Sequence, residues 1–320
     1  MIMNNILGKI RESNKIAITF HVSPDGDSLG SSLALMMGLH KIGKEAYILS
    51  KEEIPGNFKF LPCSDMVDGK SVTIRPNTEC VIVLDCGDVK RINAELDLNN
   101  KEYTIINIDH HMSNDLYGDL NYVDTNASAM SETVYQMLRI MGIKIDKDMA
   151  ICLYTSLITD TGSFKYSGTT SVTHTIAGDL INTGIDFSEI HRIVFDNKKF
   201  DTIKLRGKAI EKMEVIDEEI CIMVITKEML SELGLDSETD TSDIINIGMQ
   251  VNSVETTALI KEADDGVKVS LRSKSKVDVR KVAEGFGGGG HIRASGLKME
   301  NRTVEEAKKL IVNELKNWFK

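Results

Sequence analysis

The stretch that decides the fold is KIAITFHVSPDGDSLGSSLALMMGLHKI, residues 15–42. Its first six residues, KIAITF, form a short apolar run that contains β-branched residues, which predicts a buried strand. Residues 29–42 place apolar side chains at helical spacing, so a helix is expected to follow. A strand that leads into a helix is the repeating unit of α/β proteins.

The same pattern continues outward through the first half of the chain. Three more apolar runs predict strands, namely EAYILS (45–50), CVIVLD (80–85) and YTIINI (103–108). Amphipathic segments predict further helices at residues 128–142, 148–159 and 171–183. Because strands that alternate with helices require crossover connections, we expect a mostly parallel, doubly wound α/β sheet in an N-terminal domain, residues 1–185.

The second half of the chain has a different pattern. Residues 186–215 are helical in pattern and strongly charged, which predicts a helical linker. Beyond the linker, strands are predicted at residues 219–226, 255–263 and 267–273, and helices at residues 277–284 and 303–318. This order favours a second, smaller α+β domain over residues 216–320.

Length and composition agree with two folded domains. A chain of 320 residues is too long for one core of ordinary size. No apolar run reaches the roughly 18 residues of a membrane span, and the polar residues 1–15 do not resemble a secretory signal. Five cysteines without a CxxC pair are typical of a reducing compartment, so we expect a cytoplasmic protein with no membrane partner.

The net charge of −10 argues against a partner such as long duplex nucleic acid. A short ligand that carries phosphates is compatible with this charge, because residues 268–293 hold seven Lys and Arg against two acidic residues. This basic patch favours an anionic ligand, although an ordinary solvated surface explains the patch equally well when it is taken alone.

Three of the four predicted strands of the first half lead directly into side chains of the kind that bind metals. In chain order these side chains are His21, Asp25, Asp27, Asp85, Asp109, His110 and His111. Because the carboxyl ends of parallel strands meet at one edge of a sheet, we expect them to lie together. Asp160 is a further candidate, because a carboxylate is unfavourable at the carboxyl end of a helix and therefore suggests another role.

The chemistry of these side chains favours two divalent ions over one. Carboxylates and imidazoles without a thiolate suit Mn²⁺, Mg²⁺ or Fe²⁺. Six protein ligands are too many for one catalytic ion with open positions, but they suit two ions that share a bridging carboxylate. Such a pair stabilises the entering and leaving oxygens of phosphoryl transfer. The residues therefore predict metal-assisted hydrolysis of a phosphate ester.

A second motif, GFGGGGH, occupies residues 285–291. It has the spacing of a dinucleotide-binding loop, but the segment before it is helical in pattern, which excludes that interpretation. Consecutive glycines let backbone N–H groups approach an anion closely. The nearby Arg272, Ser273 and His291 favour an anion site, and a plain flexible turn is the alternative.

These motifs resemble those of the DHH phosphoesterase superfamily. HVSPDGDSLGS (21–31), LDCGD (84–88), DHH (109–111) and LYTSLITDTGSF (153–164) are similar to its four motifs and occur in the same order. LRSKSKVDVRKVAEGFGGGGHIRASG (271–296) resembles the DHH-associated C-terminal domain with its GGGH signature. The resemblance spans nearly the whole chain. The two-domain layout is most similar to the bifunctional oligoribonucleases and pAp phosphatases, also called nanoRNases.

The resemblance implies two Mn²⁺ ions as cofactors, with Mg²⁺ or Fe²⁺ as alternatives. The ligands it implies for the first ion are His21, Asp25 and Asp85. The ligands it implies for the second ion are Asp27, Asp85, His110 and Asp160, so that Asp85 would be the bridge.

The resemblance also implies roles beyond metal binding. His111 would face the substrate phosphate or support the metal ligands, and Asp109 would orient a ligand; with Asp85 and His110 they form the implied catalytic set. The residues implied to bind the substrate are Arg272, Ser273, Gly288, Gly289, Gly290 and His291. The active-site cleft would lie between the two domains, where closure would gate the reaction.

The activity implied is that of a Mn-dependent phosphoesterase that releases mononucleotides from short oligoribonucleotides and dephosphorylates pAp to AMP. Relatives in the same superfamily hydrolyse pApA or cyclic di-AMP, so a phosphodiesterase of nucleotide signalling is the alternative. A nucleotide sensor without activity is disfavoured, because every expected ligand position is intact. A homodimer through an exposed helix near residues 128–142 is left open.

Overall fold

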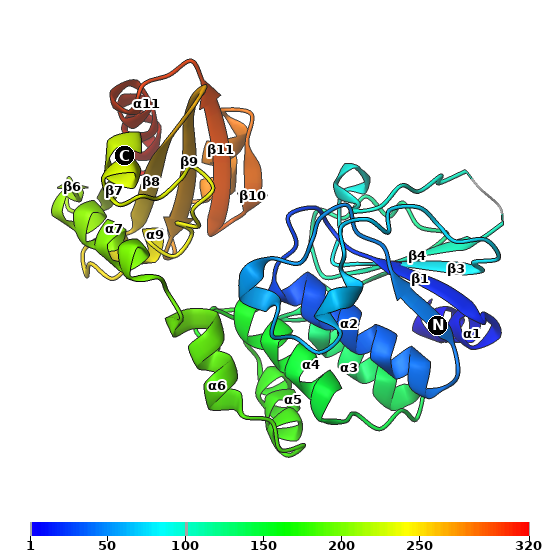
Figure 1. The fold of residues 1–320 in the computed structure, drawn as a ribbon. Coiled ribbons are helices and arrows are strands. Elements are labelled where there is room, and N and C mark those ends of the chain that lie inside the picture. The colour runs from blue at the N-terminus through cyan, green and yellow to red at the C-terminus, as the bar shows by residue number, and fades with distance from the viewer. Residues whose placement is uncertain (1, 100–101, 320) are drawn as a thin grey trace. The chain divides into compact units, whose positions relative to one another are not determined.

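The computed structural model describes residues 2–99 and 102–319 (Figure 1). They divide into two compact units, with the boundary between Asn197 and Lys198. Each unit has its own sheet and its own hydrophobic core. No helix in these residues combines the length and the apolar composition that a membrane span requires.

The first unit is built on a five-stranded parallel sheet, which confirms the predicted α/β class. Its strands in spatial order are β2 (Glu45–Ile48), β1 (Lys15–Thr19), β3 (Cys80–Leu84), β4 (Thr104–Asp109) and β5 (Leu120–Val123). In the register of the central pair, Ile16 of β1 lies opposite Cys80 of β3. The edge strand β5 is missed by the sequence pattern, because LNYV is short and only half-buried.

The helices of the first unit supply its main core. They are α1 (Ile2–Glu12), α2 (Gly26–Lys41), α3 (Met130–Ile140), α4 (Lys147–Asp160), α5 (Ser171–Ile181) and α6 (Phe187–His191). Helices α1 to α4 bury apolar side chains together with Ile16 and Ile82 of the sheet. Ala17 and Val81 point to the opposite face, which packs on residues 86–98. Short 3₁₀ turns are η1 (Gly56–Phe58), η2 (Ser64–Met66) and η3 (Val89–Arg91).

Helices α2 and α4 cross at close range, because α2 carries glycines where the two meet. A Cβ atom at Gly26 would lie 2.6 Å from Cγ2 of Thr159, and one at Gly30 would lie 3.0 Å from Cβ of Ser156. The Cβ at Gly30 would also overlap the carbonyl oxygen of Cys152. Only a residue without a side chain fits such an approach. The crossing brings the first turn of α2 beside the last turns of α4.

The segment with the helical-linker prediction, residues 186–215, differs from one connecting helix. It contains α6, a π-helical turn η4 (Arg192–Asp196) and α7 (Phe200–Glu211), with a break between η4 and α7. Ile190 of α6 packs into the core of the first unit, whereas Leu205 of α7 packs into the second. Each half of the segment is therefore stabilised by a different core.

The second unit contains a six-stranded mixed sheet. Its strands in spatial order are β10 (Gly289–His291), β11 (Ala294–Glu300), β9 (Gly266–Ser273), β8 (Thr256–Ala263), β7 (Ile220–Ile225) and β6 (Glu214–Ile216). Only the pair β7 and β8 is parallel among the described pairs. This mixed sheet confirms the smaller α+β unit.

Helices cover the two faces of this sheet unequally. The remaining helices are α8 (Lys227–Glu232), α9 (Ile245–Gly248), α10 (Val279–Glu284) and α11 (Val304–Lys316), with the 3₁₀ turn η5 (Asn317–Phe319). Helices α10 and α11 bury one face from β7 to β11. On the other face α7, α8 and α9 bury side chains of β7 and β8, while Lys268, Gly296 and Lys298 of β9 and β11 are exposed.

Candidate metal centre

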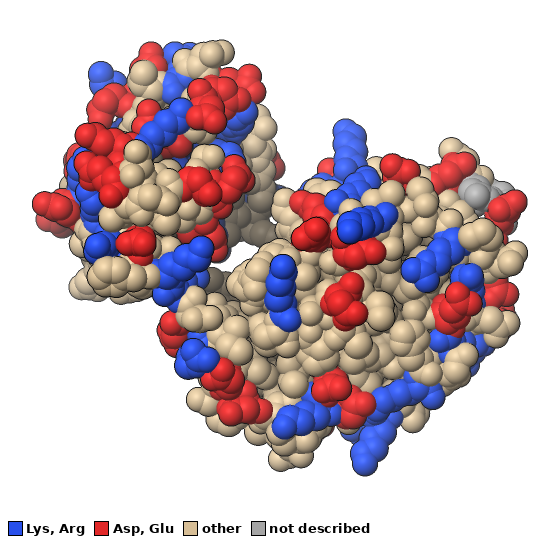
Figure 2. Space-filling model, in the orientation of Figure 1, with Lys and Arg blue, Asp and Glu red and all other residues tan. Residues whose placement is uncertain are grey.

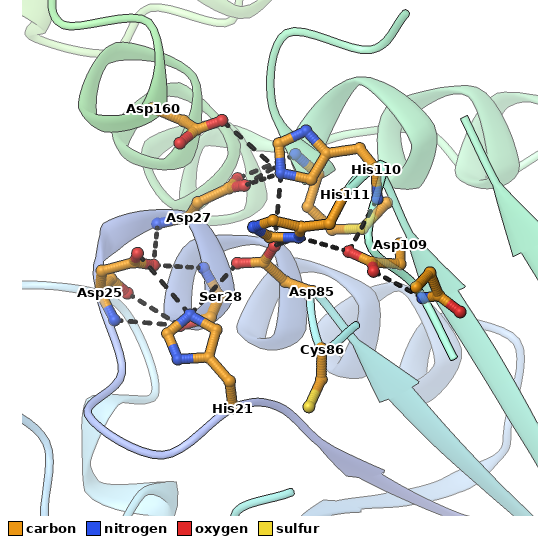
Figure 3. A network of polar contacts seen from close by, with 12 residues as sticks. His21, Asp25, Asp27, Ser28, Asp85, Cys86, Asp109, His110, His111 and Asp160 are labelled. Carbon is orange, nitrogen blue, oxygen red and sulfur yellow. Dashed lines mark hydrogen bonds and ion pairs between the residues drawn. The ribbon is translucent and has the colours of Figure 1, made fainter. Parts of the chain in front are cut away.

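The metal-binding side chains predicted in the first unit lie together at the carboxyl edge of its sheet. Strand β1 leads to His21, β3 leads to Asp85, and β4 ends at Asp109, as Figure 3 shows. The topology explains the cluster, because these three strands are neighbours and parallel. Helices α2 and α4 add Asp27 and Asp160 from their crossing.

The first candidate group contains His21, Asp25 and Asp85. Nε2 of His21 lies 3.7 Å from Oδ2 of Asp25 and 3.5 Å from Oδ2 of Asp85. Nδ1 of His21 donates its proton to the carbonyl oxygen of Val22 at 2.8 Å. Nε2 is therefore the ring nitrogen that faces the space that the two carboxylates share, which is the arrangement of a metal ligand.

The second candidate group contains Asp27, His110 and Asp160. Nε2 of His110 lies 3.5 Å from Oδ2 of Asp27 and 3.7 Å from Oδ2 of Asp160. The same atom lies 3.3 Å from Oδ1 of Asp85. Nδ1 of His110 donates to the carbonyl oxygen of Ala127 at 3.1 Å, which again leaves Nε2 as the acceptor.

Asp85 lies between the two groups, with Oδ2 3.5 Å from Nε2 of His21 and Oδ1 3.3 Å from Nε2 of His110. The residue is 2% exposed, and its backbone is left-handed with a φ of 54°. Its Oδ1 atom is buried and has no hydrogen-bond partner among the described residues. A buried carboxylate oxygen without a donor is costly unless a cation compensates it.

Asp27 is held by two groups that the sequence analysis missed. The backbone N–H of Met130, at the start of α3, donates to both oxygens of Asp27 at 3.0 and 2.9 Å. The hydroxyl of Ser156 donates to Oδ1 of Asp27. Ser156 precedes Asp160 by one helical turn, so the two lie on the same face of α4. This spacing could have identified Ser156 from the sequence. Asp25 is held in another way, as the N-cap of its own helix α2.

Asp109 orients His111 behind the two groups. Its Oδ1 atom accepts from Nδ1 of His111 at 2.7 Å and from the backbone N–H of His110 at 2.8 Å. Its Oδ2 atom accepts from Nδ2 of Asn114 at 2.6 Å. Asn114 is a second residue that the sequence analysis missed. Nδ1 of His111 also lies 3.5 Å from Oδ1 of Asp85.

The ionisation of the cluster is strongly perturbed. Burial lowers the pKa of His21, but the carboxylates of Asp25 and Asp85 outweigh it and raise that pKa to about 10. Burial and the nearby carboxylates raise the pKa of Asp160 to about 7. Burial likewise raises the pKa of Asp27 well above its ordinary value. Carboxylates this crowded and this poorly hydrated need a cation to neutralise them.

The donor set fits divalent metal ions of the oxygen- and imidazole-binding kind. The neighbouring Cys86 donates its thiol to the carbonyl oxygen of Asp88, and burial raises its pKa to about 12, so it is no thiolate ligand. Asp88, which follows the same strand, caps the turn η3 through the N–H of Lys90. Oδ1 of Asp85, which accepts no hydrogen bond from the described residues, and Nε2 of His21 and of His110 therefore fit a pair of ions.

The candidate substrate residues of the second unit fall into two kinds. The register across β10, β11 and β9 places His291, Ala294 and Arg272 in one row, so His291 and Arg272 flank a small residue. Ser273 belongs to the opposite, buried face, and its hydroxyl donates to the carbonyl oxygen of Val277 at 2.6 Å. Its side chain thus has a structural partner.

The second half of the glycine-rich motif, residues 285–291, is a strand. Gly289, Gly290 and His291 form β10, which pairs with β11. A Cβ atom at Gly290, whose φ is 140°, would lie 2.6 Å from the carbonyl oxygen of Ala294, and one at Gly288 would also overlap β11. A Cβ at Gly289 would meet nothing within 4 Å. Packing within the unit therefore requires Gly288 and Gly290 but not Gly289.

The basic patch over residues 268–293 is largely engaged within its own unit. Lys276 pairs with Glu219 at 3.0 Å, and Arg280 pairs with Asp278 at 3.2 Å. Lys274 and Arg293 donate to backbone carbonyl oxygens at 2.8 and 2.7 Å. The total charge of the segment therefore overstates what is available to a ligand.

Comparisons with known proteins place the chain among relatives that share both units. Residues 15–157 match the N-terminal domain of the DHH family, and residues 226–320 match the DHHA1 domain. A probable bifunctional oligoribonuclease and PAP phosphatase NrnA of Streptococcus mutans is 32% identical over 98% of this chain and 98% of that one. The bifunctional oligoribonuclease and PAP phosphatase NrnA of Thermus thermophilus is 28% identical over 91% of this chain and 86% of that one.

A solved structure agrees with this relationship. An exopolyphosphatase-related protein from Bacteroides fragilis superposes with a TM-score of 0.92 and 28% identity, covering 99% of this chain and 96% of that one. The order of motifs, the two matched domains and the full-length similarity confirm the resemblance drawn from the sequence. The chain belongs to the DHH family, with the DHH N-terminal domain followed by a DHHA1 domain.

Proposed function

We propose that this chain is a Mn²⁺-dependent phosphohydrolase that releases mononucleotides from short oligoribonucleotides and dephosphorylates pAp to AMP. The proposal is supported by full-length relatives of 28–32% identity that carry the names of oligoribonucleases and PAP phosphatases. It is also supported by the chemistry of the metal centre, which needs no reference to those names.

The observation that carries the proposal is the position of Asp85. Its buried, unpartnered Oδ1 and its Oδ2 face different groups of ligands, one around His110 and one around His21. We infer that Asp85 would be a ligand of two ions, held together with His21 and Asp25 on one side and with the group around His110 on the other. A pair of divalent ions supplies charge stabilisation for an in-line attack of water on a phosphate ester.

The other residues of the centre have positioning roles in this proposal. Ser156 donates to Oδ1 of Asp27 and the N–H of Met130 donates to both oxygens, which holds the carboxylate with Oδ2 toward Nε2 of His110. Asp109 holds the proton of His111 on Nδ1, which fixes the orientation of the ring. His111 is then suited to contact a phosphate oxygen or the leaving group.

For the second unit we propose a role in substrate binding. Arg272 and His291 lie in one row of the sheet, and the bare backbone at Gly289 lies in the neighbouring row of the same face. This pattern supports contacts to a second phosphate and to a nucleotide. Gly288 and Gly290 contribute to the proposed site indirectly, because they allow β10 to lie close to β11. Ser273 contributes because it follows Arg272 in the chain.

The proposed partners are short RNA and adenine nucleotides. Figure 2 shows Lys and Arg interspersed with Asp and Glu on the face that it draws, and the net charge is −10, so long duplex nucleic acid is not proposed. All five cysteines are free thiols, which supports a cytoplasmic location. A homodimer through α3 stays a prediction; α3 buries Met137 and Leu138 within its own unit and exposes Ile140.

A panel of substrates tests the proposal. pAp, pApA, cyclic di-AMP and a labelled five-nucleotide RNA are each incubated with the protein in Mn²⁺, in Mg²⁺, in Fe²⁺ and with a chelator, and the products are separated. Strong Mn²⁺-dependent hydrolysis of pAp and of the RNA is expected. Faster hydrolysis of pApA or cyclic di-AMP would keep the metal chemistry and make the protein a signalling phosphodiesterase. Binding of pAp without any product would identify a nucleotide sensor.

A further inference from the structure

The chain takes an unusual course directly after Asp160. Gly162, Ser163 and Phe164 all have left-handed backbones, with φ angles of 56°, 61° and 64°. This conformation suits glycine, but it is unfavourable for Ser163 and Phe164, because their Cβ atoms crowd the backbone. Three such residues in a row are retained only where the surrounding structure holds them, and strain of this kind gathers at functional sites.

The left-handed turn places the ring of Tyr166 over Gly162. The backbone N–H groups of Lys165 and Tyr166 both donate to the carbonyl oxygen of Thr161 at 3.0 Å, which folds the chain back on itself. A Cβ atom at Gly162 would lie 2.6 and 2.8 Å from Cε1 and Cε2 of Tyr166. One face of the ring therefore rests on the glycine two residues after Asp160.

Core packing explains the position of the Phe164 ring but not that of the Tyr166 ring. Phe164 packs against the main core and stacks on His174, with ring centres 5.0 Å apart and an angle of 28°. Tyr166 is 54% exposed and belongs to none of the apolar clusters of the described residues. Its hydroxyl makes no hydrogen bond to any part of the chain that the structure describes. One face of the Tyr166 ring is thus held against Gly162, and the rest of the side chain is largely exposed.

We propose that Tyr166 stacks on the nucleobase of the nucleotide whose phosphate lies at the Asp160 side of the metal centre. An exposed, immobilised aromatic ring is how proteins bind single-stranded nucleotides without reading their sequence, because every base has a flat face. The first unit would then recognise a base as well as a phosphate. This inference rests on the proposed function and adds a base-binding residue to it.

Kinetics with and without a base test the inference. Tyr166→Leu is expected to lower kcat/KM for pAp roughly 5- to 100-fold, the range of one base–aromatic stack. Ribose 3′,5′-bisphosphate, which lacks the base, should be hydrolysed by Tyr166→Leu as well as by the unmodified protein. Tyr166→Phe, which keeps the ring, should restore most of the loss. Val172→Ala, at a residue 47% exposed on α5, is the matched surface control.

Equal losses for pAp and for the abasic substrate would overturn the inference, since the ring would then serve the backbone of the turn. No loss in Tyr166→Leu would overturn it as well. If the unmodified protein hydrolyses none of the nucleotides, the proposed function fails instead, and this outcome is separate from the first two.

A binding measurement tests the stack without any turnover. Tyr166→Trp is made together with Trp318→Phe, so that the fluorescence comes from position 166 alone, because the chain has one tryptophan. AMP is expected to quench this fluorescence, and ribose 5-phosphate at the same concentration is not. Quenching that is absent or equal for both ligands would remove Tyr166 from the site.

Discussion

The two units present their candidate functional residues in opposite ways. In the first unit, side chains such as His21, Asp27 and Asp85 are buried at strand ends and helix starts, and neighbouring groups fix their orientation. In the second unit, Arg272 and His291 belong to one row of the sheet, where Arg272 is half-buried and His291 is exposed. We therefore expect the first site to depend on every neighbour, and the proposed second site to depend on single side chains.

The largest effect in the first unit is expected from a change at Asp85. Asp85→Asn keeps the size of the side chain but removes the charge shared by the two groups. We expect kcat to fall by more than about 100-fold. Replacing a residue that only hydrogen-bonds to a metal ligand already lowers metal affinity or activity roughly 10- to 100-fold, and Asp85 is proposed to be a ligand itself. Bound metal, measured by elemental analysis, should fall with it. Retention of more than a tenth of the turnover would contradict the bridging role.

Matched glycines test whether burial makes the first unit more sensitive. Gly30→Ala should destabilise the protein by about 1–3 kcal/mol, because its Cβ atom overlaps α4. Gly207→Ala on α7 should stabilise by about 0.5–1 kcal/mol, because glycine is unfavourable within a helix. Its Cβ atom would meet nothing within 4 Å. Denaturant unfolding measures both changes. Equal effects would show that α2 and α4 can move apart.

Arg272→Ala tests the claim that the second site depends on single side chains. We expect KM for pAp to rise roughly 10- to 100-fold, the worth of a charge-assisted hydrogen bond. The metal content and the unfolding midpoint should stay unchanged. A loss of bound metal in this variant would assign Arg272 a structural role instead.

Ser156→Ala tests the neighbours of the buried site. Loss of its hydroxyl removes one of the two donors to Oδ1 of Asp27, so the affinity for one of the two proposed ions should fall roughly tenfold, as for other groups that hydrogen-bond to metal ligands. Calorimetric titration with Mn²⁺ distinguishes one weakened site from two. Ser32→Ala is the control, because Ser32 is equally buried and its hydroxyl has no hydrogen-bond partner among the described residues.

Gly289→Ala should have the smallest effect on stability, within about 0.5 kcal/mol, which is usual for an exposed position. Its Cβ atom would meet nothing within 4 Å, so any rise in KM would report on the ligand alone. Thermal unfolding and KM for pAp are measured side by side. A large loss of stability would mean that β10 needs this glycine for its own pairing.

The parallel sheet and its ligand edge were predictable, because strand ends such as those before His21 and Asp85 must converge in a parallel topology. Local pattern could not find Asn114 or the N–H of Met130, because each acts on a carboxylate through tertiary contacts. The strand at residues 289–291 was not predicted, since no periodicity marks a strand made of glycines.

The predicted helical linker, residues 186–215, is another feature that local sequence pattern predicts only in part. Its charged residues have helical spacing throughout, yet α6 ends early and α7 begins again after a break. The cores of two different units, into which Ile190 and Leu205 pack, decide where each helix is stabilised. Helical periodicity predicts that a segment can be helical, but not which core each half joins.

The left-handed backbone of Asp85 also constrains how this protein can change over evolutionary time. At a φ of 54°, Gly and Asn are tolerated far better than most other residues. A descendant that lost catalysis but kept its fold would therefore be expected to carry one of these two residues at position 85. Gly or Asn there, in an otherwise intact relative, would mark a lineage that had exchanged hydrolysis for another role.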